Sequence, residues 1–376
     1  MDERIRKIVT ELPGMRDFTD VWKVAARSLA RGKPDFLADL GIALTEAYGP
    51  GAVRIRQYRH VLGHLLQSLA VTPGPENIAE ALRLASSAEA VDRRVGRETA
   101  SVLASCHPAE DLTVAFTGKA TEELRSCLVH ELVLRGVAVM EFPVIAAWAE
   151  SSHWSFHPLR WLPWTRSEVE GRPELPHYGA RGSSHSLPYG PAGSGRAIPA
   201  TRARLPRAEE TTTEAAATRI GSAVANWVEE SNGLVEARVF RPARPVDAGS
   251  VPALMRTLGL GCLETKGKKK DGFTATASSP GHAWAVLFAA ASTGGAYNSG
   301  THGAYGRLAA WHSLAGLAGA AEESTVEEVE ARVRGCDWYS FDTSTGWFNG
   351  VAWDIGLAAL SPDGLRLAVL AATDTD

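Results

Sequence analysis

The chain has 376 residues, which is enough for two or three domains, and 45% hydrophobic with 22% charged residues is the composition of a folded protein. A formal net charge of −4 argues against a general nucleic-acid-binding or anionic-membrane surface. No apolar run reaches the ~18 residues of a membrane-spanning helix, and the charged residues 1–7 lead into no signal-peptide-like stretch, so we expect a cytoplasmic protein that contacts neither nucleic acid nor membrane.

Residues 1–152 are predicted to form a helical domain. Leu62, Leu65 and Leu69 recur with helical periodicity, and the Pro-acidic start of one expected helix at residues 34–39 recurs 41 positions later at residues 75–80. This period is typical of HEAT-like helix pairs, and an irregular helical bundle is the alternative. The expected helices span residues 15–31, 35–48, 53–70, 75–89, 91–106, 119–138 and 142–152.

The four cysteines lie far apart without a Cys-x-x-Cys pair, which suits reduced thiols. Cys106-His107 and Cys127 with His130 would form a zinc site only if their helices packed side by side, and the spacing matches no zinc finger. We therefore expect buried thiols and predict no metal site.

Residues 153–210 are predicted to be a connector, because they are rich in Pro, Gly, Ser and Arg. The stretch 157–164 is too aromatic for a free tether and is expected to pack on a domain surface. The stretch 179–204 has the composition of a mobile segment. An insertion that covers a ligand site is the functional alternative.

Residues 211–376 are predicted to form an α+β domain. Helices are expected at 213–231, 250–258, 281–292, 304–320 and 325–334, with a strand at 233–241 and a terminal hairpin. Helices and strands do not alternate as regular βαβ units, which favours α+β over a doubly wound sheet. The basic run at 266–272 is interpreted as an exposed turn.

A glycine-rich segment at residues 292–307 separates two of the expected helices. Its glycines would let backbone N–H groups approach an anion at a helix N-terminus, with Thr301, His302 and Arg307 as side-chain partners. Neither nucleotide-binding glycine motif is present. The alternative is that Gly and Ala permit close helix packing while Tyr297 and Tyr305 fill the gap.

The last 38 residues predict a β-hairpin around the turn at 361–364. Pro-Asp-Gly suits a type I turn with Gly364 in the left-handed region, and this turn places Ser361 opposite Leu365. In that register one apolar face is core. Its members are Val351, Trp353, Ile355, Leu357, Leu367, Val369, Ala371 and Thr373.

The same register places Asp354 opposite Ala372 and diagonal to Asp374, so two carboxylates share the other face. Two interpretations follow. The carboxylates are a structural acceptor and a terminal residue, or they form a cation, amine or sugar site, or an acid/base pair with separated pKa values.

The glycine-rich block and the ending resemble an actinobacterial family of unknown function. The residues that carry the resemblance are Gly294-Gly295-Ala296-Tyr297, the run from Ala304 to Trp311, and the two hairpin runs at 351–360 and 367–376. The resemblance implies a soluble bacterial protein and brings no activity, fold or catalytic residue with it.

We therefore expect an α+β protein that is most simply a non-catalytic module binding a protein or a small polar molecule, with no cofactor indicated. The alternative is an enzyme acting on a small polar or anionic substrate through Asp354 with His302 and Arg307. The candidate catalytic residues are Asp354, Asp374 and His302. The candidate ligand-binding residues are Gly295, Tyr297, Asn298, Thr301, Arg307 and Trp353.

Overall fold

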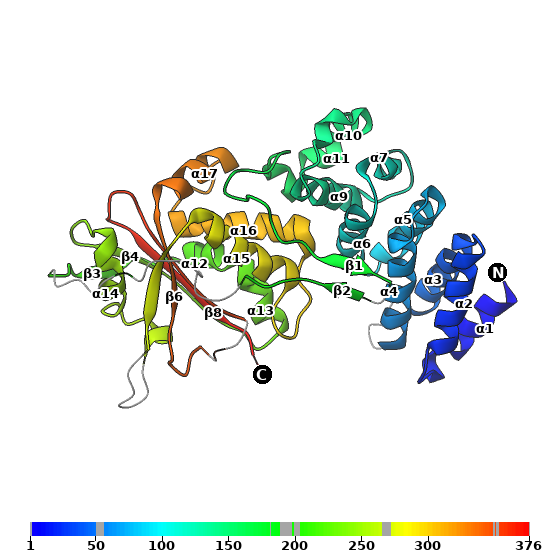
Figure 1. The fold of residues 1–376 in the computed structure, drawn as a ribbon, viewed down its shortest axis with the longest axis horizontal. Helices are drawn as coiled ribbons and strands as arrows, with labels where there is room; N and C mark the ends of the chain where they lie inside the picture. Colours follow the sequence, from blue (N-terminus) through cyan, green and yellow to red (C-terminus); the bar gives the residue numbers. More distant parts are fainter. Residues whose placement is uncertain are drawn as a thin grey trace. The chain divides into compact units, whose positions relative to one another are not determined.

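The chain divides into two compact units, each described here by itself (Figure 1). The computed structural model describes residues 2–49, 56–180, 182–188, 198, 204–264, 272–348, 350 and 353–375. Unit 1 contains Met1–Arg160 and Leu175–His185, and unit 2 contains Trp161–Glu174 and Ser186–Asp376. The predicted connector is thus divided between the units. Residues 266–271 of the basic run, with Val351 and Ala352 of the predicted strand, lie outside the described residues.

Unit 1 is helical, as predicted. Its helices are α1 (Glu3–Glu11), α2 (Thr19–Ala30), α3 (Pro34–Tyr48), α4 (Arg56–Val71), α5 (Pro75–Glu89), α6 (Arg94–Cys106), α7 (Ala109–Leu112), α8 (Val114–Thr117), α9 (Glu122–Leu134), α10 (Pro143–Ala149) and α11 (Ser152–Ser155). Pro34 and Pro75 occupy the first turns of α3 and α5, where a missing N–H costs nothing. The helix α1 was not predicted.

A short hairpin of β1 (His177–Gly179) and β2 (Gly182–Ser184) completes unit 1. The Tyr178 hydroxyl donates to Ser101 Oγ at 3.0 Å, and the Gln67 side chain donates to the Gly179 carbonyl at 2.5 Å. The second bond holds Gly179, the first residue of the predicted mobile stretch, against α4, and the first bond holds the preceding residue against α6.

Unit 2 contains a six-stranded sheet in which every neighbouring pair is antiparallel, in the order β3-β4-β8-β7-β6-β5. The strands are β3 (Ala208–Glu210), β4 (Leu234–Pro242), β5 (Thr274–Ser278), β6 (Asp337–Asp342), β7 (Asp354–Leu360) and β8 (Leu367–Thr373). The helices are α12 (Glu214–Ile220), α13 (Ala225–Glu230), α14 (Val251–Met255), α15 (Pro280–Thr293), α16 (His302–Ala318) and α17 (Val326–Gly335). The predicted α+β class is confirmed.

Both faces of this sheet are covered. The helices α15 and α16 contact β6, β7 and β8, while α14 and its flanking turns pack with the opposite face in a core that contains Leu254, Phe341 and Val369 (Figure 1). Strand β8 is buried along its whole length because it lies between two layers, which explains its continuous run of small and apolar residues. Among the described helices, none combines the length and the apolar character needed to span a bilayer.

The terminal hairpin has the predicted turn but a different register. Gly364 has φ +66°, and its N–H donates to the Ser361 carbonyl at 2.8 Å, as a type I turn requires. The Ser361 N–H, however, donates to the Arg366 carbonyl, and Leu360 pairs with Leu367. The predicted pairing of Ser361 with Leu365 was therefore wrong by one residue.

The side chain of Asp363 explains this shift. Its carboxylate accepts the Ser361 hydroxyl at 2.5 Å and the Leu365 N–H at 3.0 Å. Because the Leu365 N–H is bonded inside the loop, Leu365 does not join the ladder. Ile355 and Leu357 consequently share a face with Ala372 and Leu370, not with Val369 and Ala371.

The predicted helix at 213–231 was also wrong as a single element, because it is broken between α12 and α13. A 3₁₀ turn at Ser222–Val224 interrupts it, and the Ala223 N–H donates to the Ser313 hydroxyl of α16 at 2.9 Å. Gly316 of α16 lies so close that an added Cβ would come within 2.8 Å of the Ile220 nitrogen. Packing on α16 therefore interrupts the regular helix.

A buried ion pair attaches the segment Trp161–Glu174 to α16. The side chains of Arg307 and Glu170 are both 0% exposed, and Arg307 Nε donates to Glu170 Oε1 at 2.6 Å. Arg307 also donates to the carbonyls of Pro163 and Thr165, each at 2.9 Å, and its Nη2 donates to Glu170 Oε2 at 3.0 Å. Trp311 Nε1 also donates to Glu170, at 2.8 Å. This network satisfies both buried charges.

Replacing Glu170 by Gln should destabilise unit 2, because the Arg307 charge would stay buried without its counter-ion. Breaking one side of a buried pair typically costs about 3–5 kcal/mol. We expect a loss of this order in the free energy of unfolding, measured by chemical denaturation.

Glu168 provides a matched control, because its side chain is 85% exposed and pairs with the exposed Arg334. Glu168→Gln should leave the unfolding transition close to that of the parent. Equal losses in the two variants would contradict the importance of the buried pair.

Candidate functional site

The glycine-rich loop and Asp374 lie together in the structure. Asp374 is fully buried, and its carboxylate accepts the Ala296 N–H and the Ser231 hydroxyl, each at 2.7 Å. Gly295 permits this contact, since an added Cβ would lie 1.9 Å from Asp374 Oδ2. The carboxylate thus anchors the loop through its backbone.

Two other candidate residues of the loop, Asn298 and Thr301, make hydrogen bonds to neighbouring protein groups. Asn298 Oδ1 accepts the Gly295 N–H and the Asn226 side-chain amide, each at 3.0 Å. The Thr301 hydroxyl donates to the Ala291 carbonyl at 3.0 Å. Tyr297 is 59% exposed. The loop's polar groups thus bond to neighbouring protein groups, but the exposed Tyr297 does not fill a gap between the helices as the packing interpretation expected.

Asp354 and Asp374 do not share a face. Asp354 pairs with Thr373, whose hydroxyl donates to the Asp354 carboxylate at 2.6 Å, and the Gly350 N–H donates to it at 2.7 Å. Asp374 follows Thr373 and therefore points to the opposite side of the sheet. The predicted carboxylate pair was wrong, because it depended on the wrong register. Trp353 accepts the Asp374 N–H through its carbonyl, at 3.3 Å.

Arg307 and His302 lie in the first turns of α16. The guanidinium of Arg307 is fully buried against Glu170, so it is not presented to a ligand. His302 begins the helix with φ +61°, an uncommon conformation for a residue with a side chain. None of the candidate catalytic or ligand-binding residues predicted from the sequence lines the two cavities described next.

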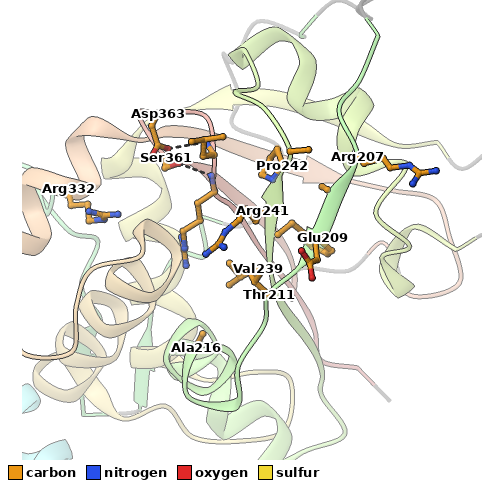
Figure 2. A pocket seen from close by; sticks show the side chains of 15 residues that line it. Arg207, Glu209, Thr211, Ala216, Val239, Arg241, Pro242, Arg332, Ser361 and Asp363 are labelled. Atoms are coloured by element: carbon orange, nitrogen blue, oxygen red, sulfur yellow. Dashed lines mark hydrogen bonds between the residues drawn. The ribbon is translucent and has the colours of Figure 1, made fainter.

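A cavity of about 1020 Å³ lies in unit 2 beside β3 and β4, and we call it the arginine cavity (Figure 2). Its walls include β3 and β4, α12 at Ala216 and the β7–β8 turn. Two acidic residues, Glu209 and Asp363, also line it. Its four arginines, which give an excess of positive charge, are Arg207, Arg241, Arg332 and Arg366. In Figure 2 the Arg207 side chain extends away from the other labelled side chains.

The carbonyl groups at the end of α16 hold two of these arginines. Arg366 donates to the carbonyls of Gly316 and Leu317, at 2.7 and 2.5 Å, and Arg332 Nε donates to Ala318 at 2.8 Å. Carbonyls in the last turn of a helix have no regular i+4 partner and carry the negative end of its dipole, and that of Gly316 also accepts the Gly319 N–H at 3.2 Å. Guanidinium groups therefore gather here without a carboxylate.

Each of these guanidinium groups has more donors than those bonds use. Arginine carries five N–H donors, and the bonds found among the described residues use one of Arg332 and two of Arg366. Burial lowers the pKa of Arg366, and its guanidinium stays charged at neutral pH because this group is not deprotonated in proteins. Hydrogen bonds from Ser361 and Leu365 lower the pKa of Asp363.

A second cavity, of about 870 Å³, adjoins the first, and we call it the aromatic cavity. Trp161 and His312 line it with their ring centroids 5.1 Å apart. Arg219 donates to the Ala320 carbonyl at 2.7 Å beside them. Burial, together with the charge of Arg219, lowers the pKa of His312.

No local motif marks either cavity in the sequence. Arg241 ends a strand, Arg366 follows a turn and Arg332 belongs to a charged helix, so each alone resembles a surface arginine. Only the packing of β4, α16 and α17 brings them together. Within the part of the chain that the structure describes, no group of three or more His, Cys, Asp or Glu side chains has the arrangement of a metal site.

Gly295→Ala should destabilise unit 2, because the new Cβ would displace the Asp374 carboxylate from the Ala296 N–H. An unsatisfied buried polar group costs about 1–3 kcal/mol, and we expect a lowered unfolding midpoint in urea. Gly346→Ala is the control, since an added Cβ there meets nothing within 4 Å. The same shift in both variants would argue against the contact with Asp374.

His312 should make the stability of unit 2 depend on pH. Its folded-state pKa lies below the ordinary value of 6.5, so the unfolded chain takes up the proton first as the pH falls. The free energy of unfolding should therefore decrease from about pH 7.5 to about pH 5.5. We expect a smaller decrease in His312→Gln, measured by urea denaturation at each pH. A decrease as steep as that of the parent would exclude this contribution.

Comparison with known proteins identifies a family and no activity. A search of curated proteins and a search of solved structures each returned no match. The model of DUF6183, a family of unknown function, matches residues 19–376, which include all of unit 2 and nearly all of unit 1. This agrees with the resemblance seen in the glycine-rich block and the terminal hairpin. The chain belongs to the DUF6183 family.

Proposed function

We propose that this chain is a ligand-binding protein whose unit 2 binds a small anionic molecule in the arginine cavity. The observation that carries the proposal is the set of Arg241, Arg332 and Arg366 around one cavity, whose described lining includes only two acidic residues. A guanidinium is a planar fork that binds carboxylate or phosphate oxygens with two hydrogen bonds.

The local arrangement favours binding of an added anion over neutralisation of the arginines by carboxylates of the protein itself. The carboxylate of Asp363 already accepts the Ser361 hydroxyl and the Leu365 N–H. Arg332 and Arg366 bond to carbonyl groups and make no ion pair within 4.0 Å of a carboxylate among the described residues, although the charge of Arg332 helps to lower the pKa of Asp363. Glu209 lies opposite Arg241 in the β3–β4 pair, so these two opposite charges are neighbours at this edge of the sheet.

Binding is favoured over catalysis by the chemistry of the walls. No histidine, cysteine or lysine is among the described residues that line the arginine cavity. The Ser361 hydroxyl both donates to Asp363 and accepts the Arg366 N–H at 2.9 Å. It is thus held as part of the turn, and the Asp363 carboxylate beside it has a lowered pKa, which makes it a weak general base.

We also infer that α3 to α6 are helix pairs of a HEAT-like repeat. This is supported by the packing of α3 against α5 and of α4 against α6, in addition to the packing of successive helices. A repeat whose units stack on their neighbours has this pattern. The equivalent proline starts of α3 and α5 agree with it.

The test of anion binding is calorimetry with inorganic pyrophosphate on the full chain and on Arg241→Ala. A hydrogen bond to a charged group contributes about 1.5–3 kcal/mol, so the variant should bind at least ~10-fold more weakly. The affinity of the parent should also fall as NaCl is raised.

Arg334→Ala is the charge-matched control. Arg334 lies on α17 near Arg332, pairs with Glu330 at 2.5 Å and is not a lining residue. Its loss should leave the affinity close to that of the parent. No binding by the parent, or an equal loss in both variants, would overturn the proposal.

A further inference from the structure

The two cavities of unit 2 are neighbours that share a wall. Arg366 and Ala216 line both of them. Arg366 is fixed at this boundary by the carbonyls of Gly316 and Leu317, and Gly319 makes room for it, since an added Cβ would lie 2.7 Å from Arg366 Nε. A ligand that reaches across the boundary would pass a guanidinium held in place.

The cavities differ in chemistry. The arginine cavity has an excess of positive charge, whereas the aromatic cavity balances Arg219 and Arg366 with Glu214 and Glu322. The wall of the aromatic cavity instead contains two flat aromatic rings, those of Trp161 and His312. The Trp161 ring lies beside the His312 ring, and the Trp161 Nε1 atom donates to the Ser324 carbonyl at 3.1 Å, which fixes the indole.

We infer that the anionic ligand is a nucleotide, with its phosphates in the arginine cavity and its base against Trp161 and His312. This inference rests on the proposed anion binding. Aromatic side chains stack on any nucleobase, and the Glu214 and Glu322 carboxylates are acceptors for the amino and hydroxyl groups of a nucleoside. The volumes, about 1020 and 870 Å³, lie in the range of small-molecule sites.

A single nucleotide fits the observations better than a nucleic-acid strand does. The two cavities supply one cationic and one aromatic compartment, and a strand needs a series of both. The formal net charge of −4 also disfavours a polyanion on the surface as a whole.

The test compares ADP with inorganic pyrophosphate, both without divalent metal, by calorimetry on the full chain. ADP should bind about 10-fold more tightly, because stacking of one base adds to the phosphate contacts. Trp161→Ala should remove this advantage while the affinity for pyrophosphate stays unchanged. Arg241→Ala should weaken both ligands.

Further variants keep the test decisive if Trp161→Ala fails to fold. Trp161→Phe retains a ring and should retain most of the ADP advantage, and His312→Ala should reduce it. Trp164→Ala is the control, because Trp164 belongs to the same segment but does not line the aromatic cavity.

The outcomes separate the two proposals. Pyrophosphate binding that depends on Arg241, without tighter binding of ADP, would overturn the nucleotide inference and leave anion binding standing. An ADP advantage that is unchanged in Trp161→Ala and His312→Ala would overturn the inference as well. If neither ligand binds, both proposals fail.

Discussion

The carbonyl groups at the C-terminal end of α16 are the constraint on which the candidate site depends. The last turn of a helix leaves its acceptors without internal partners, and these must be bonded where water is excluded. In unit 2 the partners are Arg366 and Arg332, which come from a turn and from α17, while Arg219 of α12 bonds to the Ala320 and Ala321 carbonyls just beyond the helix. Three guanidinium groups thus meet at one place, and the two cavities lie beside them.

The N-terminal end of α16 is held by a buried ion pair. Arg307 and Glu170 are both buried, and each makes additional hydrogen bonds, so that neither charge is left unsatisfied. Such a pair adds little net stability compared with apolar packing, but it tolerates few alternative arrangements. We interpret it as the device that sets the position of Trp161–Glu174, the segment that supplies Trp161 to the aromatic cavity.

Local patterns in the sequence predicted the elements well and their non-local pairing poorly. Seven helices of unit 1, the strand β4 and the helices α14 to α17 lie where periodicity and capping residues indicated them. The strands β3, β5 and β6 were missed. β3 and β5 are short edge strands, and β6 is a mixed polar and aromatic run without clear alternation, so none carries a strong local signal.

The candidate site shows the same limit. Asp374 and Gly295 were both named as candidate site residues, and they do meet, with the carboxylate anchoring the loop through its backbone. Asp354 was paired with Asp374 through a register that the Asp363 side chain changes by one residue. Because side chains alternate along a strand, that single residue moves a carboxylate to the opposite face.

The sequence by itself determined the α+β class, the helical first half, the left-handed Gly364 of the terminal turn and the resemblance to the family. These depend on periodicity, on backbone conformations that only certain residues adopt easily, and on runs of adjacent letters. The tertiary structure alone decided which arginines meet, because Arg241, Arg332 and Arg366 are distant in the chain. Arg332 and Arg366 meet around the end of α16, where carbonyl groups attract positive charge, and Arg241 lines the same cavity from β4.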